Sequence, residues 1–225
     1  MAMILNIDTA TERASVCISS DGELLAIRES NSQKDHASFL HVAIQSLLDE
    51  VGLKPLALDA IAITSGPGSY TGLRVSMAAA KGLCFALKKP LIAVNTLEVM
   101  ARAARDFLLN QPHDTALLCP MIDARRMEVF TALYDFDLNV LLNPCSLVLQ
   151  QDSFDSWLTK PVYFFGNGGM KASLFEKANA EFINIQLSAK YLGKISFELF
   201  NRKTFSDIAY LEPAYLKEFY TVKPI

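Results

Sequence analysis

Two similar runs of strands and helices, one in each half of the chain, most constrain how this sequence folds. Ser20-Asp-Gly22 is typical of a β-hairpin turn, and apolar residues recur at helical spacing from His36 to Val51. The elements predicted for the first half are strands at 4–7, 15–19, 24–29, 60–64 and 91–94, and helices at 36–51, 72–87 and from Thr96, which we expect to cap its helix. Their order, βββαβαβα, predicts an antiparallel trio followed by parallel strands with helical crossovers.

The second half repeats this order in a shorter form. The elements predicted there are strands at 117–122, 127–134, 145–149 and 162–165, a turn at 135–139, a short helix at 154–158, a glycine turn at 166–169 leading into a helix, and a last long helix capped by Ser188. We therefore expect an α/β fold of two related lobes, residues 1–113 and residues 114–225, with the second abbreviated.

Composition limits the class of protein. Hydrophobic residues make up 51% and charged residues 20% of the chain, a globular balance. No apolar stretch reaches the roughly 18 residues of a membrane span, and the N-terminus leads directly into a strand, so we expect a cytoplasmic protein without a membrane partner. The net charge of −3 and the scattered basic residues argue against a large nucleic-acid footprint. The four cysteines are far apart in apolar surroundings, which indicates buried thiols.

The segment from Ser65 to Arg74, Ser-Gly-Pro-Gly-Ser-Tyr-Thr-Gly-Leu-Arg, stands between a predicted strand and a predicted helix. Its glycines permit close approach of the backbone to a ligand, and the N-terminus of the following helix favours an anion. The alternative is an ordinary tight turn. The spacing matches neither a dinucleotide-binding fingerprint nor a P-loop, and no lysine follows the last glycine, so a P-loop NTPase is not expected.

A duplicated lobe whose first strand ends in Asp8 resembles the actin-like, or ribonuclease H-like, superfamily that includes sugar kinases and heat-shock chaperones. Within it, several motifs together resemble the bacterial TsaB family, also called YeaZ. They are Ile4-Leu-Asn-Ile-Asp-Thr9, His36 before an amphipathic helix, the glycine loop 65–74, Lys81-Gly-Leu83, Asp123-Ala-Arg-Arg126, Gly166-Asn-Gly168 and Pro213-Ala-Tyr-Leu216. The similarity runs almost end to end. Tyr70 and Lys217 depart from the residues usual in the family.

This resemblance implies a non-catalytic subunit of the machinery that makes threonylcarbamoyladenosine in tRNA. The implied partners are TsaD, a catalytic paralogue that transfers the threonylcarbamoyl group, and TsaE, an ATPase; self-association is also implied, and tRNA is reached only through the complex. We expect no cofactor of its own, with ATP or ADP and Mg²⁺ only in the assembled complex. The residues implied for a degenerate phosphate-loop site are Asp8, Thr9, Gly66, Pro67, Gly68, Ser69, Thr71 and Gly72.

Ala10 distinguishes this chain from the phosphotransferases of the superfamily. They carry Asp-x-Gly-Thr after the first strand, whereas this chain has Asp8-Thr-Ala-Thr11, and the Cβ of Ala10 hinders a positive-φ turn around phosphate. We therefore expect no autonomous ATP hydrolysis. For Asp8 two roles remain open, a cation ligand or a residue that caps the hairpin through its own backbone.

The helix predicted at 72–87 carries a stripe of small residues beside its apolar face, namely Gly72, Ser76, Ala79 and Ala86. Small side chains allow another helix to approach, either one of the same lobe or one of a partner. The predicted partner interface comprises His36, Phe39, Gly72, Arg74, Ser76 and Ala79. For Arg74 alone we expect a surface position facing a carboxylate or phosphate.

Asp123, Arg125 and Arg126 form a charged motif between two predicted strands. Two interpretations remain open, a charged hairpin with internal ion pairs or a fixed charge pair at the cleft between the lobes. His36 and His41 do not suggest a metal site, because residues five apart on a helix point roughly 140° apart. Two rival functions are kept, a stand-alone small-molecule kinase and a glycoprotease-type metallopeptidase.

Overall fold

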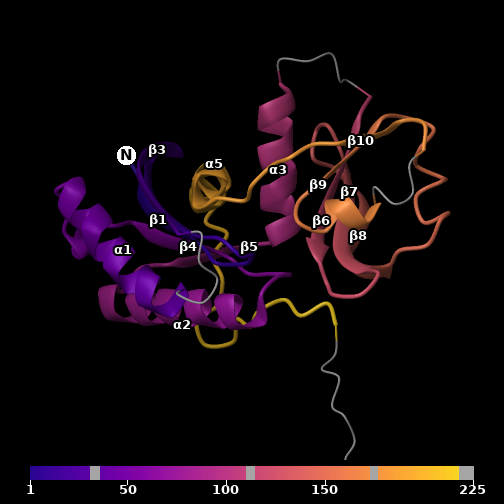
Figure 1. Ribbon diagram of the computed structural model, residues 1–225. Helices are drawn as coiled ribbons and strands as arrows, with labels where there is room; N and C mark the ends of the chain where they lie inside the picture. Colours follow the sequence, from indigo (N-terminus) through magenta and orange to yellow (C-terminus); the bar gives the residue numbers. More distant parts are fainter. Residues whose placement is uncertain (31–35, 110–114, 173–176, 218–225) are drawn as a thin grey trace, which may run out of the picture.

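The computed structural model describes the chain except residues 31–35, 110–114, 173–176 and 218–225. Two five-stranded mixed sheets lie side by side (Figure 1). The first sheet has the order β3-β2-β1-β4-β5 and the second the order β10-β9-β6-β7-β8, so both lobes follow one topology. The predicted α/β fold of two related lobes is therefore confirmed.

The first sheet forms as predicted, with an antiparallel trio followed by two parallel strands. Its strands are β1 (Met3–Asp8), β2 (Ala14–Ser20), β3 (Glu23–Ser30), β4 (Ala60–Thr64) and β5 (Leu91–Val94). The hairpin turn takes positive φ at Asp21 and Gly22, as the Ser20-Asp-Gly22 signal indicated.

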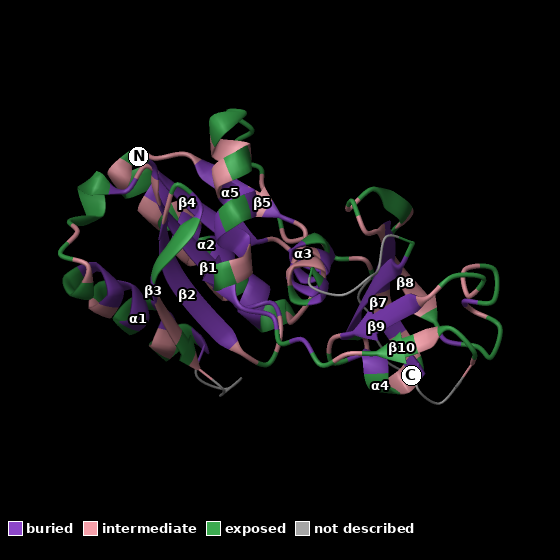
Figure 2. Cartoon of the chain, turned by 90° about the horizontal axis from the view of Figure 1, so that it is seen from above, coloured by how far each residue is buried: buried purple, intermediate pink, exposed green. Residues whose placement is uncertain are grey.

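Two helices cover one face of the first sheet, α1 (His36–Glu50) and α2 (Tyr70–Leu87), with a 3₁₀ turn η2 (Pro55–Ala57) between α1 and β4. Leu40 and Leu47 of α1 and Met77 of α2 pack onto the alternate apolar residues of β1, β2 and β4. Figure 2 shows the buried inner sides and exposed outer sides of both helices. The amphipathic periodicity thus predicted correctly which face of α1 is buried.

The helix α3 (Thr96–Leu108) lies between the two sheets (Figure 1). Its apolar side chains join one core with inward residues of both sheets, such as Ile92 of the first and Phe165 of the second. Thr96 was expected to cap this helix, but the cap is Asn95, whose Oδ1 accepts a hydrogen bond from the Leu97 N–H at 2.9 Å. The lobes are therefore joined by a hydrophobic layer.

The second sheet contains β6 (Leu117–Asp123), β7 (Glu128–Asp135), β8 (Val140–Val148), β9 (Val162–Phe165) and β10 (Ala180–Phe182). The strand predicted at 145–149 begins earlier, at Val140, because it pairs along the full length of β7. The helix predicted at 154–158 does not form: residues 151–159 make successive turns, and the Asp155 and Trp157 N–H groups reach back only three residues. The predicted helix after the glycine turn is the short α4 (Gly169–Ala172). The three-residue β10 was not predicted.

The last helix, α5 (Leu192–Asn201), follows a 3₁₀ turn η4 (Ala189–Tyr191) and packs on the first sheet, opposite α1 and α2. The Ser196 hydroxyl donates to Asn6 Oδ1 at 2.7 Å, and the Ala189 N–H donates to Ser15 Oγ at 2.7 Å. Ser188 does not cap the helix; its hydroxyl donates to Glu29 instead. The boundary predicted between the lobes, at residue 113, lies outside the described residues. That boundary assigns α5 to the second lobe, whereas α5 contacts the first.

The four cysteines are free thiols, and three of them are buried as predicted. Cys145 is only half-buried, because it lies on β8 at the edge of the second sheet. Burial raises the pKa of Cys17 and of Cys119 to about 12, so both are neutral apolar side chains at physiological pH. Across the described part of the chain, no helix combines the length and apolar composition that a membrane span requires.

Candidate functional site

The glycine loop connects β4 to α2 and is fixed by its own chain on several sides. The Gly66 N–H donates to Thr96 Oγ1 at 3.2 Å, and the Ser69 N–H donates to the Ala10 carbonyl at 2.6 Å. From the C-terminal segment, the Ala214 N–H donates to the Ser65 carbonyl at 2.7 Å. The loop N–H groups of Gly66 and Ser69 are therefore used within the protein, as is that of Ser65, which donates to the Val94 carbonyl.

Two glycines of this loop lie against the turn that follows β1. A Cβ atom at Gly68 would fall 2.2 Å from the Ala10 carbonyl oxygen, and one at Gly72 would fall 2.0 Å from the Thr9 carbonyl oxygen. The Thr9 hydroxyl also donates to the Gly72 carbonyl at 2.7 Å. The sequence was right that this loop needs close backbone approach, but the approaching group is the protein's own chain.

Ser69 provides the N-cap of α2, and its Oγ accepts a hydrogen bond from the Gly72 N–H. The helix therefore begins at Tyr70, two residues before the predicted start. Thr71 is exposed in its first turn, and Pro67 follows a cis peptide bond. This capping uses one of the N–H groups that an anion would need.

Asp8 ends β1 and is completely buried. Its Oδ1 accepts hydrogen bonds from the Thr64 hydroxyl at 2.7 Å and from the Ala10 N–H at 3.1 Å. The second bond is the hairpin cap considered from the sequence. Its other oxygen, Oδ2, is buried without a hydrogen-bond partner among the described residues. Desolvation by burial raises the pKa of Asp8 to about 6, although both hydrogen bonds act in the opposite direction.

Three of the residues predicted for the partner interface are buried inside the first lobe. His36 packs beside Gly72, and its Nε2 lies 3.4 Å from the Glu12 carbonyl. Ser76 is fully buried and bonds to carbonyls of its own helix. The small-residue stripe thus faces the lobe at Gly72 and Ser76, and Phe39 and Ala79 are only partly exposed.

The outer side of α1 and α2 carries a different set of residues. We call this surface the α1–α2 face; its exposed members are Val42, Ala78, Gly82, Phe85 and Ala86. Phe85 is 82% exposed and Val42 70%. The stripe predicted from the sequence shares Ala86 with this face, but its members Gly72 and Ser76 are buried, because the periodicity does not show which of two small-residue stripes faces the core.

Arg74 pairs with no carboxylate among the described residues and contacts two tyrosines of its own chain. Its guanidinium lies 3.9 Å from the centre of the Tyr70 ring, and its Nε donates to the Tyr215 hydroxyl at 3.0 Å. Tyr215 belongs to the C-terminal segment, which therefore lies along the start of α2. The arginine was predicted correctly at the surface, but it holds this segment in place.

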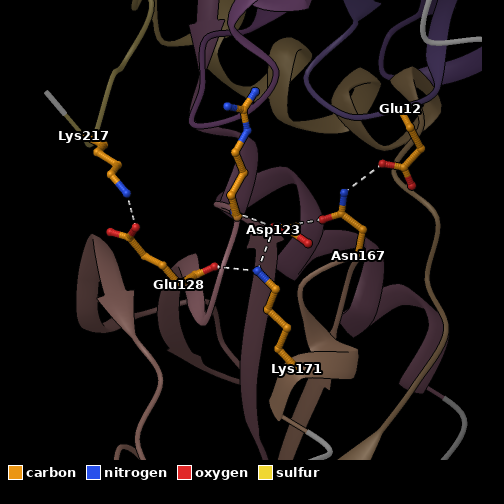
Figure 3. A network of polar contacts seen from close by, with 7 residues as sticks. Glu12, Asp123, Glu128, Asn167, Lys171 and Lys217 are labelled. Atoms are coloured by element: carbon orange, nitrogen blue, oxygen red, sulfur yellow. Dashed lines mark hydrogen bonds and ion pairs between the residues drawn. The ribbon is translucent and has the colours of Figure 1, made fainter. Parts of the chain in front are cut away.

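Asp123 lies in a polar network that links the two lobes (Figure 3). The Asn167 Oδ1 atom accepts a hydrogen bond from the Asp123 N–H. Its Nδ2 atom donates a hydrogen bond of 2.8 Å to Glu12 of the first lobe. Lys171 pairs with Asp123 at 2.7 Å and also donates to the Glu128 carbonyl. The predicted position between the lobes is thus occupied by Asp123, but its ionic partner is Lys171.

Two lysines neutralise the carboxylates of this network. Burial alone would raise the pKa of Asp123, but the hydrogen bonds from Lys171 and from the Arg125 N–H outweigh it and hold the pKa below its ordinary value. Lys217 pairs with Glu128 and, with Ser146, lowers the pKa of that carboxyl. The sequence did not place Asn167, Lys171 and Lys217 in this network, since nothing in their local pattern locates them near Asp123 or Glu128.

Within the described ranges, no group of three His, Cys, Asp or Glu residues is placed to hold a metal ion. Asp8 has one carboxylate oxygen, Oδ2, that is buried and has no hydrogen-bond partner among the described residues.

The comparison with known proteins agrees with this geometry. The family model described as TsaD, tRNA N6-adenosine threonylcarbamoyltransferase, matches residues 25–191. The "tRNA threonylcarbamoyladenosine biosynthesis protein TsaB" of Bacillus subtilis is 32% identical over 73% of this chain and 70% of its own length. The TsaB of Escherichia coli is 35% identical over 60% of this chain and 56% of its own length.

A solved structure extends the similarity to nearly the whole chain. "YeaZ from Pseudomonas aeruginosa" aligns with a TM-score of 0.79 at 26% identity, covering 96% of this chain and all of that one. The activator of 2-hydroxyisocaproyl-CoA dehydratase from Clostridium difficile, with a TM-score of 0.51 at 12% identity, shares the fold alone. With its two lobes and these relatives, the chain belongs to the TsaB family, also called YeaZ.

Proposed function

We propose that this protein takes part in tRNA threonylcarbamoyladenosine biosynthesis as a non-catalytic subunit that pairs with a TsaD-type transferase. The observation that carries the proposal is the closed glycine loop, which packs on Thr9 and Ala10 above a completely buried Asp8. We infer from this packing that the loop does not hold a phosphate chain and that catalysis is left to the partner. The TsaD family model that matches residues 25–191 supports a paralogous pair.

The α1–α2 face supports the pairing. Exposed apolar residues on adjacent helices mark interaction surfaces, and small residues let a partner helix come close. We propose that TsaD, or a second copy of this chain, docks there, that TsaE joins the pair, and that ATP or ADP with Mg²⁺ binds only in the assembled complex in the cytoplasm.

Replacing Phe85 by Asp should weaken both associations. An aromatic side chain central to an interface typically contributes 2 kcal/mol or more, about a 30-fold change in affinity. Sedimentation velocity of the chain alone and with purified TsaD measures the effect. Met170→Asp is the matched control, because Met170 is equally exposed, at 82%, but lies on α4 of the second lobe. Equal behaviour of the two variants would place the interface elsewhere.

The isolated protein should not turn over ATP. Because the loop packs on its own chain and the N–H groups of Gly66, Ser69 and Gly72 already make hydrogen bonds within it, we expect phosphate release at the rate of a no-enzyme blank. A coupled phosphate-release assay, run beside the assembled complex, checks this. Nucleotide titration of the isolated chain tests the kinase alternative, and metal analysis of purified protein tests the metallopeptidase alternative. A rate equal to that of the complex would contradict the scaffold role.

A further inference from the structure

The tip of the β6–β7 hairpin is built in an unusual backbone conformation. Arg125 and Arg126 are consecutive and both have positive φ, 70° and 49°. Side chains other than Gly, Asn or Asp adopt this region at a steric cost, and such strain persists only where surrounding structure holds it. Neither arginine contributes packing that would explain the choice, since both are exposed.

Hydrogen bonds on both sides hold the tip rigid. The Arg125 N–H donates to Asp123 Oδ1 at 2.6 Å, the Glu128 N–H donates to the Arg125 carbonyl at 3.2 Å, and the Ala124 N–H donates to the Glu128 carbonyl at 3.1 Å. Asn167 fixes Asp123 from the other side, through the Asp123 N–H. The two arginines are therefore presented from a preorganised turn.

The neighbouring carboxylates do not pair with these arginines. Asp123 pairs with Lys171 and Glu128 with Lys217, while Glu12 accepts from Asn167 (Figure 3). Arg125 lowers the pKa of Asp123 through space, but within the described residues neither guanidinium makes a hydrogen bond or an ion pair. The two guanidinium groups therefore remain available to bind an anion at the junction of the lobes.

We propose that Arg125 and Arg126 contact phosphates of the tRNA backbone when the protein acts in its complex. Guanidinium groups bind phosphate oxygens through paired N–H donors. Residues 125–127 are all exposed at the tip of the hairpin. A free small anion requires a concave site, whereas a polyanionic strand can lie across a protruding turn. A contact of one or two phosphates also agrees with the net charge of −3.

The substitution Arg125→Gly/Arg126→Gly separates this role from folding. Glycine adopts positive φ without steric cost, so the thermal midpoint should not fall below that of the wild type. Binding of unmodified tRNA by the complex with TsaD should weaken about 10-fold at 100 mM salt. The slope of log affinity against log salt should decrease by about 1 to 2, corresponding to two lost phosphate contacts. Arg125→Lys/Arg126→Lys should keep most of the slope.

Lys160→Gly/Lys203→Gly is the matched control. It removes the same charge, Lys203 also has positive φ, at 55°, and Lys160 lies beside Pro161 at the opposite end of β6. We expect its tRNA affinity to stay within about 2-fold of wild type. Equal losses in both double variants, or an unchanged salt slope in the arginine variant, would overturn the proposal.

The inference rests on the proposed function, and sedimentation of the same samples keeps the two apart. Loss of pairing with TsaD by the wild-type chain counts against the proposed function. If the pair with TsaD stays intact and its tRNA affinity is unchanged by the arginine substitutions, only the phosphate contact is contradicted. A variant that loses pairing but keeps tRNA affinity would assign the arginines to the protein interface and refute the RNA contact.

Discussion

Replacing Asp8 by Asn is expected to stabilise the protein at pH 8, by about 2–3 kcal/mol. The folded-state pKa of Asp8, about 6, lies above its ordinary value of 3.8, because burial disfavours the charge. Each pKa unit corresponds to about 1.4 kcal/mol, so ionising this carboxyl in the folded state costs roughly 3 kcal/mol. Asn keeps an oxygen for the Thr64 and Ala10 hydrogen bonds and carries no charge.

The sign of the pH dependence follows from the same shift. Between pH 4 and pH 6 the folded protein holds a proton on Asp8 that the unfolded chain has released. The contribution of Asp8 to stability is therefore fully present below about pH 4 and is lost as pH rises through 6. Urea denaturation of wild type and Asp8→Asn from pH 4 to pH 8 should give curves that diverge over this window.

A surface substitution and a cation titration complete this experiment. Asp137→Asn changes an exposed carboxylate and should alter stability by less than about 0.5 kcal/mol at every pH. If Asp8→Asn were destabilising at pH 8, and if Mg²⁺ stabilised only the wild type, the buried oxygen would be a cation ligand instead. That result would restore the alternative role considered from the sequence.

Replacing Gly72 by Ala is expected to destabilise the protein by about 3 kcal/mol or more. In an ordinary helix this substitution is favourable by up to about 1 kcal/mol. Here the new Cβ would fall 2.0 Å from the Thr9 carbonyl oxygen, a backbone atom that moves only if the turn after β1 moves. The Thr9–Gly72 hydrogen bond would be lost with it.

Gly82 supplies the matched control in the same helix. A Cβ there meets nothing within 4 Å, so Gly82→Ala should stabilise by about 0.5–1 kcal/mol. Chemical denaturation of the three proteins at one pH measures both changes. Equal effects of the two substitutions would show that the glycine loop does not close on Thr9 in solution, and the argument against nucleotide binding would lose its basis.

The strand and helix order could be predicted from sequence because it depends on local signals. The short apolar runs of β1 and β4, the helical periodicity of α1 and the turn at Asp21-Gly22 are signals that extend over a few residues. Predictions failed where a local signal was weak or a neighbour decided the outcome. Asn95 rather than Thr96 caps α3, and residues 154–158 form successive turns in place of the predicted helix.

The sequence by itself determined the duplicated α/β order, the family resemblance and the missing glycine at Ala10. Only the tertiary structure decided that the glycine loop packs on Thr9 and Ala10 and that Ser76 faces inward and Phe85 outward. It also decided that Asp123 forms its ion pair with Lys171 and not with the arginines. The reason is physical: patterns along the chain fix backbone conformation locally, whereas the contact of Thr9 with Gly72 joins residues 63 positions apart and that of Asp123 with Lys171 joins residues 48 positions apart.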